Sequence, residues 1–573
     1  MNLGVLLGVS FIVLLVAYLT YGRYLAKQWG VNLTDKADPT PAHAQFDDVD
    51  YVPAKAPILL GHHFSSIAGA GPINGPILAA FFGWLPVVLW ILIGGIFVGG
   101  VHDFGSLFAS VKNRGCSIAS VIETSVGSVA KKLFIAFAYL TLLLLIAAFS
   151  AIVANTFAAD IAPNGQVIHS AVTEANAITA MISLWFIAIA IVFGNLVYKH
   201  KMPLGITTFF SLVALLLLMY YSLSFHPIYL SSTTWLTIVG IYIAVASIAP
   251  VWILLQPRDY LSSFLLYAMI IISVIGIFGL HPSTPMPAIT DSAFVARYTN
   301  LGSLFPALFI TIACGAVSGF HATVSSGTTS KQLDKEAQAL PIGYGSMLIE
   351  SFLAIISLCA IAYVWKSVTA STKVATPVII FATGLSNIVK DCFGFSATIE
   401  HMIYTFFVLA VSVFCLTSLD TSTRIARYMF QEFWLSAGET ANDVRGFKKI
   451  LVNPYLATFV TVGLGMSLGY KGYEHIWPLF GATNQLLASL ALLGIASWLD
   501  HSHKNTRMIY IPMAFLLIAT IYSLIQSAIF NHKLLATGEI MWPAIRLSIV
   551  ILLLILSADL ITKVFVTKFK NKK

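Results

Sequence analysis

The chain has 573 residues, of which 58% are apolar and only 10% charged, and its mean hydropathy is +0.87. Because soluble domains carry roughly 25% charged residues, this composition excludes a soluble protein and predicts an all-α integral membrane protein. The formal net charge of +8 then indicates basic cytoplasmic loops and not a nucleic-acid partner. The five cysteines have no paired spacing, which favours small core residues over a disulfide or metal framework.

Apolar runs long enough to cross a bilayer predict about fifteen transmembrane helices. In chain order they fall at 2–20, 58–80, 85–111, 131–158, 173–198, 203–224, 234–256, 260–280, 303–327, 341–366, 396–418, 451–469, 475–498, 509–529 and 541–565. A weaker segment, 374–390, is expected to be an extracellular helix that does not span. The stretch 21–57 is expected to form an extended cytoplasmic arm, and 419–450 a cytoplasmic loop that opens with an amphipathic helix.

The basic residues predict the orientation. With the N-terminus outside, 25 of the 32 Lys and Arg residues fall in inner loops, and the C-terminus is cytoplasmic. In this layout Arg258 and Asp259 are expected in a tight cytoplasmic turn.

The stretch "GHHFSSIAGAGPINGP", Gly61–Pro76, is unusual for a membrane span. Gly and Pro interrupt helical hydrogen bonding, and the freed backbone groups are tolerated only inside protein or beside a cavity. We therefore expect a broken helix with a binding site at the break, as in secondary transporters; the alternative is a kinked packing helix. The candidate substrate-binding residues here are His62, His63, Ser65, Ser66, Gly69, Gly71 and Asn74.

A second stretch, "GAVSGFHATVSSGTT" at 315–329, repeats the order Gly, His, Ser-Ser, Gly. It lies in a span of opposite predicted direction, as inverted repeats require. We expect both segments to be unwound and to face each other, with His63 and His321 holding a carboxylate or a proton. The alternative is a neutral histidine bonded to a freed carbonyl. The candidates in this second stretch are Gly319, His321, Ser325, Ser326 and Gly327.

These repeats divide the chain into five parts. They are an N-terminal helix and arm (1–57), a first inverted repeat (58–224), two linking helices (225–302), a second repeat (303–498) and two C-terminal helices (499–573).

Three carboxylates are predicted at membrane depth, where ionisable side chains usually mark function. Asp103 needs a partner, and the adjacent His102 is expected to point elsewhere around the helix. Glu350 lies near mid-helix and must be protonated or paired. Asp420 serves either in a cation site or proton relay, or in a surface pair with Arg424 at i,i+4.

Hydroxyl groups surround Asp420 in "CLTSLDTSTRIAR" and are oxygen ligands suited to a small cation. The predicted coupling residues are Thr417, Ser418, Asp420, Thr421, Ser422, Glu350 and Asp103. Asn484 and Gln485 are expected to form interhelical hydrogen bonds.

The sequence contains no GxSxG, HExxH or P-loop motif, so we expect neither an enzyme nor a cofactor.

Seven motifs resemble the carbon starvation protein A family. They are "GHHFSSIAGAGPINGP", "VHDFGSLF", "RDYLSSFLL", "ACGAVSGFHATVSSGTTSKQL", "IGYGSMLIESF", "SLDTSTRIARYMFQE" and "WPLFGATNQLLA". The resemblance implies a multi-pass uptake protein of the bacterial inner membrane with the LeuT-like five-plus-five core of the amino acid–polyamine–organocation superfamily. Family members are described as pyruvate–proton symporters or as peptide transporters, induced on starvation. In that fold, the 417–422 segment would approach the break in 58–80 and form a proton or Na+ site.

Among substrates, the residues favour a small monocarboxylate such as pyruvate, because half-helix N-termini and a histidine can hold it without a cationic side chain. Short peptides or amino acids are second, with Glu350 or Asp103 receiving the amino group. A passive channel is third, because a channel needs a continuous polar lining. The sequence does not predict the oligomeric state.

Overall fold

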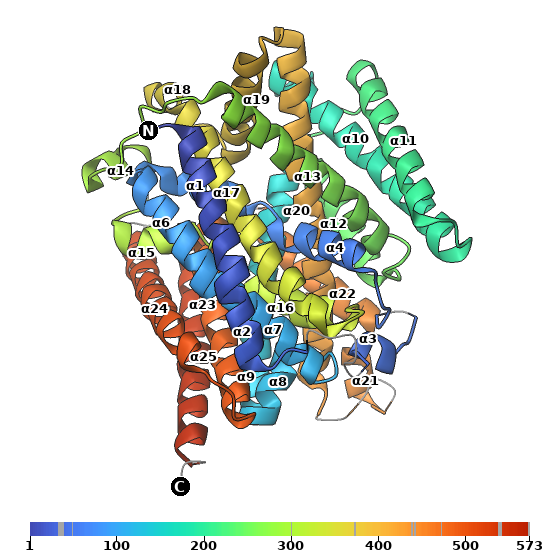
Figure 1. Cartoon of the computed structure of the whole chain (residues 1–573), viewed down its shortest axis with the longest axis vertical. Helices are drawn as coiled ribbons and strands as arrows, with labels where there is room; N and C mark the ends of the chain where they lie inside the picture. The colour runs from blue at the N-terminus through green and yellow to red at the C-terminus, as the bar shows by residue number, and fades with distance from the viewer. Residues whose placement is uncertain are drawn as a thin grey trace.

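The computed structural model describes residues 1–32, 39–48, 50–299, 301–371, 374–436, 439, 443–470, 473–536 and 541–570. Long helices run side by side along the long axis of the molecule, with the start of α1 near one end and the end of α25 at the other (Figure 1). This parallel arrangement suits a protein that crosses a bilayer many times, because helices satisfy their own backbone in lipid.

The first part of the described chain contains fourteen α-helices. They are α1 (Leu3–Ala17), α2 (Arg23–Trp29), α3 (Pro41–Ala44), α4 (Ala56–Ala68), α5 (Gly71–Ala79), α6 (Trp84–Gly94), α7 (Gly100–Lys112), α8 (Ile118–Val126), α9 (Ser128–Phe157), α10 (Ala171–Gly194), α11 (Leu204–Ser224), α12 (Ser232–Ile248), α13 (Leu255–Leu280) and α14 (Ser292–Tyr298).

The second part of the described chain is equally helical. It contains α15 (Leu304–Thr311), α16 (Gly319–Gly327), α17 (Ser346–Tyr363), α18 (Trp365–Ala370), α19 (Pro377–Phe393), α20 (Ala397–Trp434), α21 (Phe447–Leu451), α22 (Pro454–Gly469), α23 (Tyr473–His501), α24 (Arg507–Ala536) and α25 (Met541–Lys570).

Within the described residues, 11 helices are long and apolar enough to span a membrane. Each coincides with a predicted span, and two further predictions coincide with the shorter apolar helices α12 and α22. The remaining two predicted spans, 58–80 and 303–327, are each divided into two helices. The membrane-protein class is thus confirmed, and the two departures from simple spans are the two segments that share the Gly, His, Ser-Ser, Gly order.

Burial distinguishes central from peripheral helices. The most apolar stretch of α23 is 100% buried inside the protein, whereas that of α11 is only 22% buried. Phe209 and Phe210 on α11 are both largely exposed, as expected for side chains that contact lipid. The divided segments lie with the central helices, because α4 packs on α20 and α16 packs on α7 and α23.

One sequence prediction about loops is wrong and another holds in part. Arg258 and Asp259 lie inside α13 and are buried, so they do not form the predicted turn. Helix α20 is one continuous helix of 38 residues that ends at Trp434, so the helix predicted at the start of 419–450 is present but continues the predicted span 396–418 directly. Within it, Thr423 Oγ1 donates to the Leu419 carbonyl, one turn earlier, at 2.7 Å.

Two further loop predictions hold in part. The predicted arm 21–57 is helical up to Trp29 and contains the short helix α3; the rest of the arm includes residues outside the described range. The predicted helix 374–390 is confirmed as α19, which packs against α13, α17 and α20.

Candidate functional site

The first predicted break lies between α4 and α5. Helix α4 ends at Ala68 and α5 begins at Gly71. The linking Gly69 has a φ of +40°, a conformation that L side chains rarely adopt. A Cβ atom placed on Gly69 would lie 2.7 Å from the Phe149 ring and 2.9 Å from Ser418 Oγ. Glycine is therefore required here both by backbone conformation and by space.

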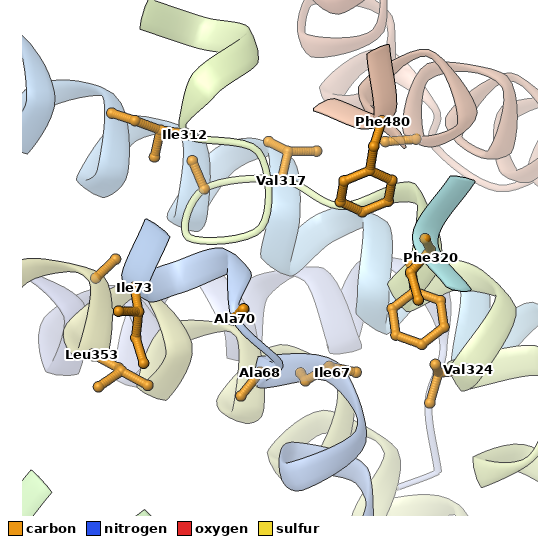
Figure 2. Packing of buried hydrophobic residues seen from close by; sticks show 14 of the residues in the cluster. Ile67, Ala68, Ala70, Ile73, Ile312, Val317, Phe320, Val324, Leu353 and Phe480 are labelled. Atoms are coloured by element: carbon orange, nitrogen blue, oxygen red, sulfur yellow. The ribbon is translucent and has the colours of Figure 1, made fainter. Parts of the chain in front are cut away.

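The second predicted break lies between α15 and α16. Helix α15 ends at Thr311, α16 begins at Gly319, and the residues between them are not helical. The 312–318 loop lies against the turn at Ala70, between α4 and α5 (Figure 2). A Cβ atom on Gly71 would meet the Cys314 side chain at 2.2 Å. The two segments are thus both broken and in contact, as the sequence predicted. The breaks are confined to 69–70 and 312–318, however, so that His63 and His321, predicted in unwound chain, lie within helices α4 and α16.

Helix α20 contacts the first break through two hydroxyl groups. Ser418 Oγ donates to the Ser66 carbonyl at 2.9 Å, which is one of the carbonyls freed at the end of α4. Thr421 Oγ1 lies 3.3 Å from Ser66 Oγ. By contrast, Thr417 and Ser422 donate to backbone carbonyls of α20 itself. The expected approach of this segment is confirmed, but only two of its four hydroxyls face α4.

Next to this contact is a buried ion network, here called the Arg258 cluster. It consists of Arg258, Asp259, Asp420, His62 and Tyr242. The Arg258 guanidinium binds both carboxylates, with Nη2 2.7 Å from Asp259 Oδ1 and Nη1 on Asp420 Oδ2. His62 Nδ1 lies 2.8 Å from Asp259 Oδ2, and the Tyr242 hydroxyl donates to Asp420 Oδ2 at 2.8 Å. The cluster joins α4, α12, α13 and α20.

The Arg258 cluster contradicts one of the two alternatives for Asp420, the pair with Arg424 at the cytoplasmic surface. Asp420 is fully buried and binds Arg258, from a different helix. Arg424 instead donates to the Ala246 carbonyl at 3.2 Å and to the Ala249 carbonyl, where α12 ends. The physical reason is that α20 is buried on this side, so Asp420 and Arg424, which is itself only 2% exposed, each bind groups on a neighbouring helix.

A second buried network lies beside the second break and is here called the His321 cluster. It consists of His102, Asp103, His321 and Glu350, all with no exposed side-chain surface. His321 Nδ1 lies 2.8 Å from Asp103 Oδ2, and His321 Nε2 lies 3.4 Å from Glu350 Oε2. The imidazole of His321 therefore bridges two carboxylates from α7 and α17.

One prediction about this cluster is wrong. His102 was expected to point away from Asp103, but its Nδ1 lies 2.7 Å from Asp103 Oδ1. The ring folds back onto its neighbour because burial removes any competing water. Each carboxylate oxygen of Asp103 is thus hydrogen-bonded to a histidine ring nitrogen. By contrast, neither oxygen of Glu350 has a hydrogen-bond donor in the described part of the chain.

The charges of the His321 cluster have a chemical consequence. An ionised carboxylate in an apolar, unbonded setting is strongly disfavoured. Glu350 therefore stays neutral by carrying a proton, or ionises opposite an imidazolium at His321. Either state places one proton between Glu350 and His321, and moving it requires only a short transfer.

The other predicted residues of the first stretch are buried but make different contacts. His63 Nδ1 bonds to Thr329 Oγ1 at 2.8 Å, and Ser65 Oγ donates to the Asp259 carbonyl at 3.3 Å. Asn74 borders a cavity of about 180 Å³ that is also lined by Asn155.

In the second stretch, Gly319 permits close packing of α16 on α23, since a Cβ there would lie 2.4 Å from the Asn484 carbonyl. Ser325 is fully buried. Ser326 Oγ accepts a hydrogen bond from the Ile118 amide at 3.1 Å, and Gly327 borders a second cavity at the end of α16.

Asn484 and Gln485 form interhelical hydrogen bonds, as predicted. Asn484 Oδ1 accepts from the Phe320 amide at 2.9 Å and so caps the start of α16, and Gln485 Nε2 donates to the Phe309 carbonyl on α15. Helix α23 thus holds both sides of the second break in place.

Sequence reasoning missed the roles of Tyr242, Arg258, Asp259 and Thr329. The available signal was the pair "RD" directly ahead of the apolar run of α13. Hydropathy alone assigns such a charged pair to the membrane–water interface. Two unlike charges at the start of a span, together with unpaired polar residues in other spans, would have indicated a buried network.

Replacing Gly69 tests the first break. We expect Gly69→Ala to destabilise the protein by about 1–3 kcal/mol, because φ +40° with ψ −150° is a backbone conformation that side-chain-bearing residues rarely adopt, and further through the clash with Phe149. Thermal unfolding in detergent measures the loss, and transport should fall with it. Gly463→Ala is the matched control, because no atom lies within 4 Å of a Cβ there. If both variants behaved alike, the break would not need glycine.

Two helix breaks in contact, beside buried carboxylates, in a bundle with 11 candidate spans, define a multi-pass membrane transporter. The family described as "Carbon starvation protein CstA" matches residues 2–375 and 365–523. The chain therefore belongs to the carbon starvation protein CstA family.

Relatives cover most of the chain. It is 33% identical to "Peptide transporter CstA" of Campylobacter jejuni, over 89% of this chain and 78% of the relative. It is 32% identical to the protein of the same name in Bacillus subtilis, over 91% and 90%. It is also 32% identical to "Pyruvate/proton symporter BtsT" of Escherichia coli, over 90% and 80%. The family thus contains relatives named for two different substrates.

Solved structures resemble the chain more distantly. The manganese transporter of Eremococcus coleocola is 12% identical, with a TM-score of 0.48 over 91% of this chain and 99% of that one. MhsT in complex with L-phenylalanine is 11% identical, also with a TM-score of 0.48, over 82% and 98%.

Proposed function

We propose that this chain is a secondary active transporter that takes up a small carboxylate, pyruvate, together with a proton. The observation that carries this proposal is the His321 cluster, in which one imidazole bridges two buried carboxylates directly beside the broken segments. Such a group can bind a proton from one side and release it to the other. The pyruvate/proton symporter among the relatives is consistent with it.

The substrate site is proposed at the contact between the two breaks. Helices α5 and α16 both begin there, at Gly71 and Gly319, and helix N-termini favour anionic groups. A monocarboxylate can be held by such backbone groups without a dedicated cationic side chain. Binding beside His321 would link the substrate's charge to the proton shared with Glu350.

Uptake of a di- or oligopeptide or of an amino acid is the second candidate, and relatives named peptide transporters favour it. Such a substrate needs an acid for its amino group. Asp103 is already bonded to two imidazoles, which leaves Glu350 as the acid for this role.

We place the inverted repeats at 58–224 and 303–498, with 1–57, 225–302 and 499–573 as additions, and the protein in the bacterial inner membrane with the N-terminus outside. The opposite predicted directions of the two broken segments and the distribution of basic residues support this arrangement. Proton coupling fits the sites better than Na+, because only two hydroxyls of the α20 segment reach α4.

Uptake by purified protein in proteoliposomes tests the proposal. Labelled pyruvate, lactate, a dipeptide and an amino acid are supplied with an imposed proton gradient, a Na+ gradient or neither. We expect accumulation of pyruvate above the external concentration only with the proton gradient. Accumulation of the dipeptide alone would favour the second candidate, and equilibration without accumulation would indicate a passive channel.

A further inference from the structure

A polar cavity of about 250 Å³ lies between α8, α16 and α20, at the far end of α16 from the second break. We call it the Lys331 pocket. Its charged lining residues are Lys131, Lys331, Glu432 and Glu439, and Ser117, Ser120 and Ser326 also line it. Glu439 is paired with Lys448, whose Nζ lies 2.5 Å from Glu439 Oε2. Helix α8 lies toward the end of the molecule at which α25 ends (Figure 1), so the pocket is cytoplasmic in the proposed orientation. The pocket is lined by α16 from Thr323 to Gly327, so roughly 6–12 Å of this helix separates it from the break.

One pair of charges in this pocket is already balanced. Lys131 Nζ lies 2.8 Å from Glu123 Oε2 and 3.6 Å from Glu432 Oε1. Glu432 also accepts hydrogen bonds from Ser117 at 2.9 Å and Ser120 at 2.7 Å. Lys131 and Glu432 therefore hold each other and the surrounding helices, and neither is available to a ligand without breaking these bonds.

Lys331 differs from Lys131. Its Nζ lies over the rings of Tyr51 and Tyr428, 5.2 Å and 5.0 Å from their centroids. The Tyr428 hydroxyl donates to Asp50 Oδ1 at 2.6 Å, which fixes that ring. Among the described residues, no carboxylate lies within ion-pair distance of Lys331 Nζ, and its side chain makes no hydrogen bond. An ordered ammonium group thus borders a cavity with its hydrogen-bond donors unused.

The charge of Lys331 is retained. Burial lowers its pKa, but the nearby Tyr428, Asp50, Tyr51 and Glu432 outweigh burial and raise the pKa above its ordinary value. The side chain is therefore a permanent cation at physiological pH. A small anion with one carboxylate would complete its coordination by charge-assisted hydrogen bonds.

We propose that the Lys331 pocket is a second, cytoplasmic binding site for the carboxylate substrate, which the substrate occupies after leaving the helix breaks. This inference rests on the proposed function. Ser326 and Gly327 of α16 line the pocket and belong to the same helix as His321, so one short element connects the two sites. The ligand class is a small monocarboxylate, bound through its carboxylate to Lys331 Nζ.

Cys116 supplies a direct probe, because this native thiol lines the same pocket and is exposed. Of the other cysteines, Cys314, Cys359 and Cys415 are buried. The experiment uses the full-length Cys392→Ser protein in detergent and measures the rate of Cys116 alkylation by a charged maleimide. Burial and the nearby Glu432 raise the pKa of the Cys116 thiol, so mildly alkaline buffer is used.

We expect pyruvate to slow alkylation, and the neutral analogue pyruvamide to have no effect. Lys331→Gln should raise the pyruvate concentration needed for protection about tenfold or more, as loss of a charge-assisted contact predicts. Lys331→Arg should retain protection. Lys335→Gln is the matched control, since it removes an exposed lysine four residues away that does not line the pocket.

Two outcomes would overturn the inference: pyruvate fails to protect Cys116, or it protects the wild type and Lys331→Gln equally. The second result would mean that a ligand elsewhere alters Cys116 indirectly. Failure of the proposed function is distinguishable, because it is measured in a different assay. If the proposed function were wrong, proteoliposomes would show no proton-driven pyruvate uptake, independently of the rate of Cys116 alkylation. A melting curve of Lys331→Gln like that of Lys335→Gln shows that the variant is folded.

Discussion

Glu350→Gln should abolish accumulation of pyruvate driven by a proton gradient while leaving pyruvate exchange across the membrane intact. The amide keeps the shape of the side chain beside His321 but cannot take up and release a proton. Uptake with an imposed gradient and counterflow without one, both in proteoliposomes, measure the two activities. In Glu350→Gln we expect net uptake to stop when the internal pyruvate concentration equals the external one. The rate of counterflow should remain close to that of the wild type.

Glu174→Gln is the matched control, because Glu174 carries the same functional group outside the cluster, where it bonds to His226 and Tyr229. It should accumulate pyruvate normally. Asp420→Asn distinguishes the Arg258 cluster from the His321 cluster as the proton carrier. If Asp420→Asn lost pyruvate accumulation and kept exchange, while Glu350→Gln accumulated pyruvate normally, the Arg258 cluster would carry the proton. Proton coupling would then be assigned to the first break and not to the second.

Arg258→Ala should destabilise the protein by about 3–5 kcal/mol, because it leaves two carboxylates buried without their shared cation. Arg258 is 1% exposed and binds Asp259 and Asp420, which come from its own helix and from α20. Thermal unfolding and chemical denaturation in detergent give the change. Arg297→Ala, which removes an exposed arginine on α14, should stay within about 0.5 kcal/mol of the wild type.

A double variant shows whether the cost comes from the charge. Adding Asp420→Asn to Arg258→Ala removes one unpaired carboxylate, so the double variant should be more stable than Arg258→Ala alone. If the two substitutions acted independently, their losses of unfolding free energy would add and the double variant would be less stable. Simple addition of the two effects would indicate that Arg258 acts through packing of its aliphatic stem.

The sequence predicts the helix breaks because their causes are local. Gly69 is required at its own position by a positive φ. The glycines around it are required by the close approach of distant segments, such as Cys314 at Gly71, and the sequence shows this need only as a local excess of glycine. Hydropathy likewise finds the long spans, because lipid exposure acts on each span separately. The contact between α20 and α4 followed from the resemblance and not from the residues alone.

The partners of the buried charges could not be predicted in the same way. Arg258 and Asp420 are 162 residues apart, and His321 and Asp103 are 218 apart. Their pairing depends on how four helices pack, whereas the sequence displayed only the local alternative of Asp420 with Arg424. Similarly, α20 looked interrupted at Asp420 because an acid in an apolar run usually marks an interface, but burial against α13 supplies its counter-charge.

Proton movement caused by pyruvate tests the central claim most directly. Proteoliposomes containing the purified protein are held without any ion gradient, and a pH-sensitive dye in their lumen is followed when pyruvate is added outside. The account predicts that the lumen acidifies, that the signal requires the carboxylate and is absent with pyruvamide, and that Glu350→Gln abolishes it. Entry of labelled pyruvate without any change in lumenal pH would contradict proton coupling through the His321 cluster.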